Sequence, residues 1–130
     1  MAGVFRAMIE RAGRPKLGTS ATTLGVRLGK DIEVDPMGMV HRPSFASDGK
    51  NGISCAPSLK DLPPFVLPLR WGGMNRRTIV WRIESDQLSD DLVAMQDGPT
   101  HISIGPARSM PYDDFVAAIQ STASLWVQVV

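Results

Sequence analysis

The sequence has very few of the residues that build the commonest kinds of functional site. Cys55 is the only cysteine, so an intramolecular disulfide is impossible and a zinc site made of cysteine pairs is excluded. His41 and His101 are the only histidines, and no group of histidines or acidic residues has the spacing of metal ligands, so we expect no metal. Few side chains can therefore change charge near neutral pH.

Long apolar runs and a strong net charge are also missing. No stretch reaches the roughly 20 apolar residues that cross a bilayer, and the first residues lack the apolar core of a secretory signal. We therefore expect no membrane span and a cytoplasmic protein in its producer, with any secretion following a non-classical route. The 14 basic and 13 acidic residues leave a net charge of +1, which does not indicate nucleic-acid binding. Basic residues within 6–16 and 76–82 are expected on solvated faces.

Turn-forming residues are abundant instead. The chain holds 12 glycines and 10 prolines, which favours short strands joined by irregular loops over a helical bundle. A length of 130 residues suits one domain over residues 1–130. As a lone thiol, Cys55 is expected to fill the core as a small apolar side chain.

Periodicity predicts the secondary structure. Alternating apolar and β-branched residues predict a set of short strands or extended pieces, over residues 22–28, 31–36, 53–56, 78–84, 92–95 and 100–105. Turn-forming residues predict a turn over residues 35–38 and another at Asp97 and Gly98. Apolar residues at helical spacing predict a short helix over residues 4–12 and a longer one over 111–123. The sum is an α+β domain with one or two small, mostly antiparallel sheets and short helices.

The segment 100–115 carries the strongest local signal. Ile102 and Ile104 are predicted on one face of a strand, and His101 and Ser103 on the other. Pro111 then suits the first position of the helix that follows. A lone histidine on a strand is commonly a hydrogen-bonded structural residue, so this pattern leaves both a structural and a functional interpretation open.

Arg27, Ser54 and His101 share a setting, because each is a polar residue flanked by apolar ones on a predicted strand. Such strands can project polar groups into a cleft. Each residue alone also fits an ordinary structural role, as an edge arginine in water or a serine that bonds backbone.

Four short motifs occur in an order that resembles the Tse-two family of type VI secretion toxins, small effectors with an ADP-ribosyltransferase-like fold. They are Arg27 after an apolar residue, Gly52-Ile53-Ser54, the segment 58–63, and Thr100-His101 followed by Ile104, Pro106, Ala107, Arg108 and Met110. The resemblance spans roughly residues 24–122.

The resemblance implies an NAD-dependent ADP-ribosyltransferase or an NAD glycohydrolase. Arg27 would hold a phosphate or ribose of NAD, and Gly52 and Ser54 the nicotinamide ribose. Ser54 and His101 would be catalytic, with His101 orienting the reacting sugar or target. Trp71 or Phe65 would stack on the nicotinamide, although core packing is an alternative role for both.

The resemblance also implies partners. We expect a cognate immunity protein, or antitoxin, in the producer, and an unidentified target molecule in the cytoplasm of the target cell. The alternative from another class is a non-enzymatic interaction module that binds a protein partner through loops such as residues 63–75. Convergence of Arg27, Ser54 and His101 on one concave pocket would favour the enzyme, and three separate surface positions would favour the module.

Overall fold

The computed structural model describes residues 3–46 and 49–129, which form nine strands, one α-helix and four short 3-10 turns. The strands are β1 (Gly3–Arg11), β2 (Arg14–Pro15), β3 (Met39–Val40), β4 (Ile53–Cys55), β5 (Thr78–Glu84), β6 (Leu92–Gly98), β7 (His101–Pro106), β8 (Met110–Pro111) and β9 (Val127–Gln128). The helix is α1 (Tyr112–Gln120), and the 3-10 turns are η1 (Leu59–Asp61), η2 (Leu69–Trp71), η3 (Ser85–Gln87) and η4 (Ser121–Ser124).

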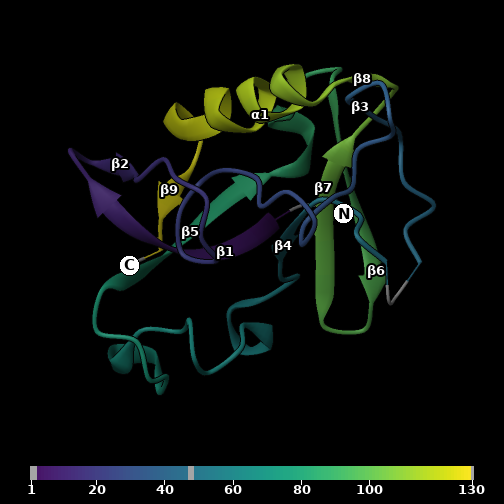
Figure 1. The fold of residues 1–130 in the computed structure, drawn as a ribbon. Helices are drawn as coiled ribbons and strands as arrows, with labels where there is room; N and C mark the ends of the chain where they lie inside the picture. Colours follow the sequence, from purple (N-terminus) through teal and green to yellow (C-terminus); the bar gives the residue numbers. More distant parts are fainter. Residues whose placement is uncertain (1–2, 47–48, 130) are drawn as a thin grey trace.

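The strands pair into three small sheets. One has the order β2-β1-β5-β9, the second β4-β7-β6, and the third is the pair β3-β8. Every strand pair in these sheets is antiparallel. Figure 1 shows the β1-β5 sheet and the β4-β7-β6 sheet side by side, with the β3-β8 pair near one end of α1.

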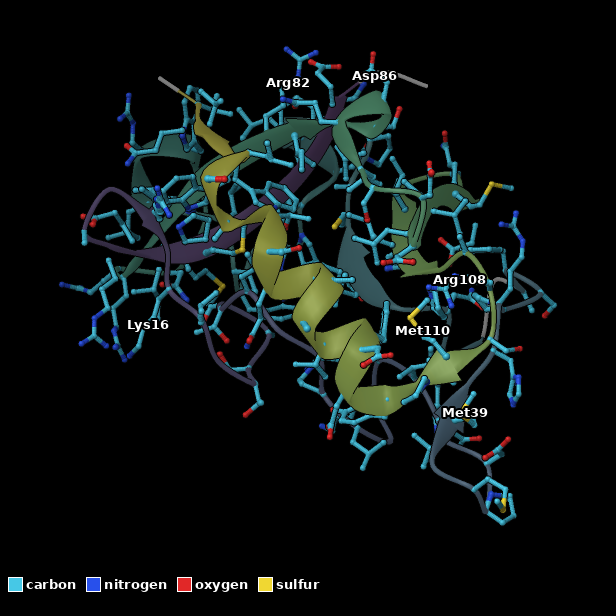
Figure 2. All side chains as sticks on the ribbon, turned by 90° about the horizontal axis from the view of Figure 1, so that it is seen from above. Lys16, Met39, Arg82, Asp86, Arg108 and Met110 are labelled. Carbon is cyan, nitrogen blue, oxygen red and sulfur yellow. The ribbon has the colours of Figure 1, made fainter. Side chains whose placement is uncertain are left out.

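The main core lies between these sheets and α1. It is built from apolar side chains of β1, β5, β7 and the helix, among them Met8, Trp81, Ile102, Ile104 and Phe115. Figure 2, seen from above, shows α1 crossing in front of the sheets. Met39 and Met110 mark its first end there, and Arg82 and Asp86 lie beyond its last end.

A second, smaller core cluster lies on the other side of β1 and β5. It joins Ala7 and Val80 to Leu62, Val66 and Leu67 of the segment between β4 and β5. In Figure 1 this segment, with η1 and η2, lies across the β1-β5 sheet from α1. Since both faces of this sheet are covered, its two central strands are apolar on both faces.

Much of the predicted secondary structure is confirmed. Strand β5 has the predicted limits and lies between β1 and β9, as its two apolar faces indicate. Strands β4 and β7 agree with the predictions within one residue at each end. The helix predicted over 111–123 is α1 continued by η4. The α+β class with mostly antiparallel sheets is confirmed.

The helix predicted over residues 4–12 is wrong, because this segment is strand β1. Val4 and Met8 contact the main core and Ala7 contacts the smaller one, so β1 is buried on both faces. A strand with apolar residues on both faces cannot be told from a helix by spacing alone.

The strand predicted over residues 22–28 is also wrong. These residues form turns and two isolated bridges, Leu17 with Leu24 and Leu28 with Ile32. The chain folds back so closely that a Cβ on Gly25 would collide with the backbone of the preceding turn. This self-contact takes the place of a sheet partner.

Two further predictions differ in extent. Among the described residues, the segment 31–36 forms no strand, although its closing turn is present, with Gly38 N donating to Asp35 O at 3.0 Å. The strand predicted over 92–95 continues to Gly98, because it pairs with β7 along almost its whole length.

Candidate functional site

A cavity of about 250 Å³ lies where β1, β4 and the start of β7 meet the loop residues 21–27 and 61–66. Arg27, Ser54 and His101 all line it, although they are far apart in the sequence. They therefore meet on one concave surface, which is the arrangement expected of an enzyme and not of a module with scattered polar positions.

Strand β4 positions Ser54. Its neighbours Ile53 and Cys55 are buried in the core, so the alternation of the strand turns Ser54 outward, opposite Ser103 of β7. Gly52, which precedes the strand, has φ +131 and lies against β7 where a Cβ would collide with the carbonyl of Ile104. Gly52 is outside the cavity lining, and its small size lets β4 approach β7.

Arg27 reaches the cavity from a loop, not from a strand as predicted. Its backbone N donates to Asp31 Oδ2 at 2.8 Å, and its Nη2 lies 3.0 Å from Asp31 Oδ1. The Asp31 side chain is only 3% exposed, so the guanidinium of Arg27 is held by a buried carboxylate. This anchoring limits the conformations of a side chain that would otherwise be mobile.

His101 is held by Asp97, a residue that the sequence assigns only to a turn. His101 Nδ1 lies 2.6 Å from Asp97 Oδ1, and the Asp97 side chain is 3% exposed. Ser103 Oγ donates to Asp97 Oδ2 at 2.6 Å, and Asn51 Nδ2 donates to the same oxygen at 2.7 Å. Burial works to raise the pKa of Asp97, but the hydrogen bonds from Ser103, His101 and Asn51 together hold it below its ordinary value.

Arg6 is the cavity residue that the sequence analysis places wrongly, on a solvated face. It is buried on β1, where Nη1 donates to Ser54 O at 2.6 Å and Nη2 to Thr23 O at 2.8 Å. Within the described part of the chain its Nε has no partner, and burial lowers the pKa of its guanidinium. The sequence does hold one signal of this burial, an arginine inside an otherwise apolar run. A strand buried on both faces tolerates such a residue when hydrogen-bond partners satisfy its guanidinium.

Cys55 also lines the cavity, and its predicted role as a small buried residue is confirmed. Burial raises the pKa of its thiol to about 12. The thiol is therefore protonated at neutral pH and is a poor nucleophile.

The two aromatic residues considered for stacking lie in different places. Phe65 lines the cavity and is largely exposed. Trp71 is outside the lining, where it packs on the smaller core cluster with the Arg70 guanidinium 5.1 Å from its ring centroid.

The described residues lack two features that would indicate another kind of site. Across residues 3–46 and 49–129, no three histidine, cysteine, aspartate or glutamate side chains are grouped so that they could hold a metal ion. No helix in the described part of the chain has the length and apolar character needed to cross a membrane.

The mostly antiparallel sheets and the single α-helix of the described residues form an ADP-ribosyltransferase-like toxin domain. The chain belongs to the Tse2 ADP-ribosyltransferase toxin family, whose model matches residues 3–128. Proteins of this family are type VI secreted effectors that use NAD. No curated protein and no solved structure matches the chain.

Proposed function

We propose that this protein binds NAD in the cavity between Arg27, Ser54 and His101 and transfers or releases its ADP-ribose. The observation that carries this proposal is the meeting of these three residues on one cavity of about 250 Å³. Two observations support the proposal: the family to which the chain belongs uses NAD, and the chain has a cavity lined by polar side chains. When bound, NAD would supply the reactive glycosidic bond between ribose and nicotinamide.

The charges around the cavity suit a dinucleotide, which carries two phosphates, because the lining holds two arginines against one carboxylate, Asp61. Arg6 and Arg27 both contribute guanidinium groups, and Arg6 has one buried N–H without a partner among the described residues. Arg27, fixed by Asp31, would hold a phosphate or ribose oxygen. Ser54 would hydrogen-bond the nicotinamide ribose, while Arg6 fixes the backbone of β4 at that residue.

The cavity is small for a whole dinucleotide. A neighbouring hollow of about 610 Å³ shares Ala21 and Arg27 with it. We place the nicotinamide end in the smaller cavity and the adenosine end toward this hollow, with Arg27 between them. Phe65 is the aromatic residue within reach of the nicotinamide end, whereas Trp71, proposed from sequence, packs elsewhere.

Melting curves with and without NAD test the binding site. Millimolar NAD should raise the melting temperature, because a ligand at 100 times its dissociation constant stabilises the folded state by about 2.7 kcal/mol. Arg27→Ala should lose most of this rise, whereas Arg82→Ala, at an exposed arginine outside the cavity, should keep it. An unchanged melting curve of the folded wild-type protein in millimolar NAD would contradict the proposal.

We further propose that an immunity protein binds the segment 63–77 in the producer cell. This segment exposes Phe65, Leu69 and Met74 beside three arginines and contains no acidic residue. A partner with apolar side chains and an acidic rim would suit it. Because Phe65 also lines the cavity, such a partner would cover the entrance to the site.

Expression in a bacterial cytoplasm tests the toxic activity and the need for this partner. The wild-type chain alone should stop growth, and co-production of the immunity protein should restore it. Growth arrest by a chain made inside the cell would support the cytoplasm of the target cell as the compartment where the toxin acts. Harmless high-level production of the folded wild-type chain would count against both the toxin and the partner.

A further inference from the structure

Strand β6 contains a β-bulge at Asp97. The register with β7 runs from Met95 opposite Ser103 to Gln96 opposite Ile102, and then passes to Gly98 opposite His101. Asp97 is therefore the extra residue between two regular pairs. Alternation along β6 places Asp97 on the same face as Met95, the partner of Ser103, and the bulge leaves Asp97 without a register partner of its own, where it bonds both Ser103 and His101.

We propose that Asp97 is a positioning residue, which holds His101 with its proton on Nδ1 and leaves Nε2 as a proton acceptor toward the cavity. This inference rests on the proposed function of the same cavity. Beyond that function, it concerns which nitrogen of His101 carries the proton and which chemical group receives the ADP-ribose.

The hydrogen bonds around Asp97 determine which nitrogen of His101 carries the proton. Both Asn51 Nδ2 and Ser103 Oγ donate to Oδ2, which leaves Oδ1 for His101. A carboxylate with so many donors stays ionised and can only accept, so Nδ1 must be the donor. No described residue bonds to the other ring nitrogen, Nε2, and His101 lines the cavity.

A free Nε2 next to the cavity suits an ADP-ribose acceptor that must lose a proton as it reacts. The ADP-ribose acceptor we infer is a hydroxyl group, from water or from a macromolecule. Its oxygen bonds to C1′ of the NAD ribose, nicotinamide leaves with the electron pair of the broken C1′–N bond, and the hydroxyl proton passes to Nε2. The imidazolium formed is then paired with Asp97. A guanidinium acceptor would instead bring a third cation beside Arg6 and Arg27, against one carboxylate in the cavity lining, Asp61.

Nitrogen-15 NMR of the histidine rings tests the positioning directly, in the wild-type protein without NAD. In its neutral form, the His101 ring should carry its proton on Nδ1. Asp97→Asn should shift His101 toward a mixture of the two tautomers. The matched control Asp35→Asn removes the charge beside His41 and should leave the His101 signals unchanged. A wild-type His101 protonated on Nε2 would overturn the inference, even if the Asp97 variant does not fold.

Kinetics and products supply the second test. Asp97→Asn should lower kcat about 100-fold with little change in KM for NAD, because Asp97 acts through His101 and not on the bound nucleotide. The products are followed with NAD labelled in its ADP-ribose part. Release of free labelled ADP-ribose identifies water as the hydroxyl source, and labelled ADP-ribose bound to a hydroxyl group identifies a macromolecule. Labelled ADP-ribose on an arginine side chain would contradict the inference.

The two proposals fail separately. A normal rise in melting temperature with NAD, together with the wrong tautomer of His101, would remove the role of Asp97 alone. The Nδ1-protonated form without any effect of NAD on the melting curve would remove the NAD site alone.

Discussion

The two histidines of this protein have similar partners and different surroundings. His41 bonds Ser109 through Nδ1 at 2.7 Å and Asp35 through Nε2 at 2.8 Å, so both ring nitrogens are occupied. Among the described residues, His101 bonds Asp97 alone, through Nδ1. The carboxylate partner of His41 is 31% exposed, whereas that of His101 is 3% exposed.

This difference shows how one pair of residue types serves two purposes. Asp35 also accepts bonds from the backbone N of Met37 and Met39, so the His41 pair closes a turn and ties it to Ser109 next to β8. At His101 the carboxylate is buried and the imidazole lines a cavity. A free nitrogen beside a cavity, and not the His–Asp contact itself, distinguishes the candidate catalytic histidine.

Replacing each histidine by glutamine should give the largest contrast. His101→Gln should lower NAD turnover and growth inhibition by about a hundredfold, because it removes a positioned proton acceptor from the site. His41→Gln should leave both unchanged, since His41 lies outside the cavity lining. Turnover, growth inhibition and thermal stability are measured on the same preparations. A destabilised but fully toxic His101→Gln would show that His101 is structural.

Each His–Asp pair also has a serine partner, and replacing that serine should give a smaller contrast between the two sites, measured as stability. Ser103 is buried and donates to the Asp97 carboxylate, so Ser103→Ala should lower the free energy of unfolding by about 2 kcal/mol. Ser109 is exposed, and Ser109→Ala should change it by less than about 0.5 kcal/mol. Urea unfolding of both variants measures the two values. Equal losses would mean that burial does not separate the two networks.

Acid and salt should reveal the smallest contrast. The pKa of Asp35 is lowered mainly by the Met39 backbone N and His41, and that of Asp97 by Ser103, His101 and Asn51 against the effect of burial. A lowered folded-state pKa stabilises the protein above the ordinary aspartate pKa. This stability is lost as the pH falls below about 4 and through the folded-state value. Asp35→Asn and Asp97→Asn should each reduce this acid dependence.

Salt should affect the stabilising contributions of the two carboxylates differently. About 0.5 M salt should weaken the contribution of the partly exposed Asp35 and leave that of the buried Asp97 nearly unchanged. Urea unfolding of the wild type and both variants at pH 7 and pH 3, in low and high salt, checks this. Equal sensitivity to salt would show that solvent screens both pairs alike.

The sequence predicted the parts of the fold that depend on local pattern. Alternation defined β5 and β7, and it placed His101 and Ser103 together on the face opposite Ile102. The turn at residues 35–38 followed from its proline and glycine. The family motifs also predicted three residues that line one cavity, Arg27, Ser54 and His101.

The parts that were missed depend on contacts between distant segments. Burial of Arg6 follows from carbonyl groups of Thr23 and Ser54, which no local pattern reveals. Asp97 lies beside Ser103 and His101 because β6 continues through it in register with β7, whereas from sequence Asp97 belonged only to a turn. Arg27 reaches the cavity by folding back onto Asp31, and a strand assignment could not anticipate that bond.

The pairing of β1 with β5 has a consequence for synthesis on the ribosome. The first strand of the chain pairs at its end with the short β2, but its long partner β5, which aligns Trp81 with Arg6, is made only after most of the polypeptide. The β6-β7 hairpin closes locally, yet the cavity needs β1 as well. A nascent or truncated chain that ends before β5 therefore cannot assemble the site and should be harmless to its producer. Growth of cells that make a chain truncated at residue 77 would check this.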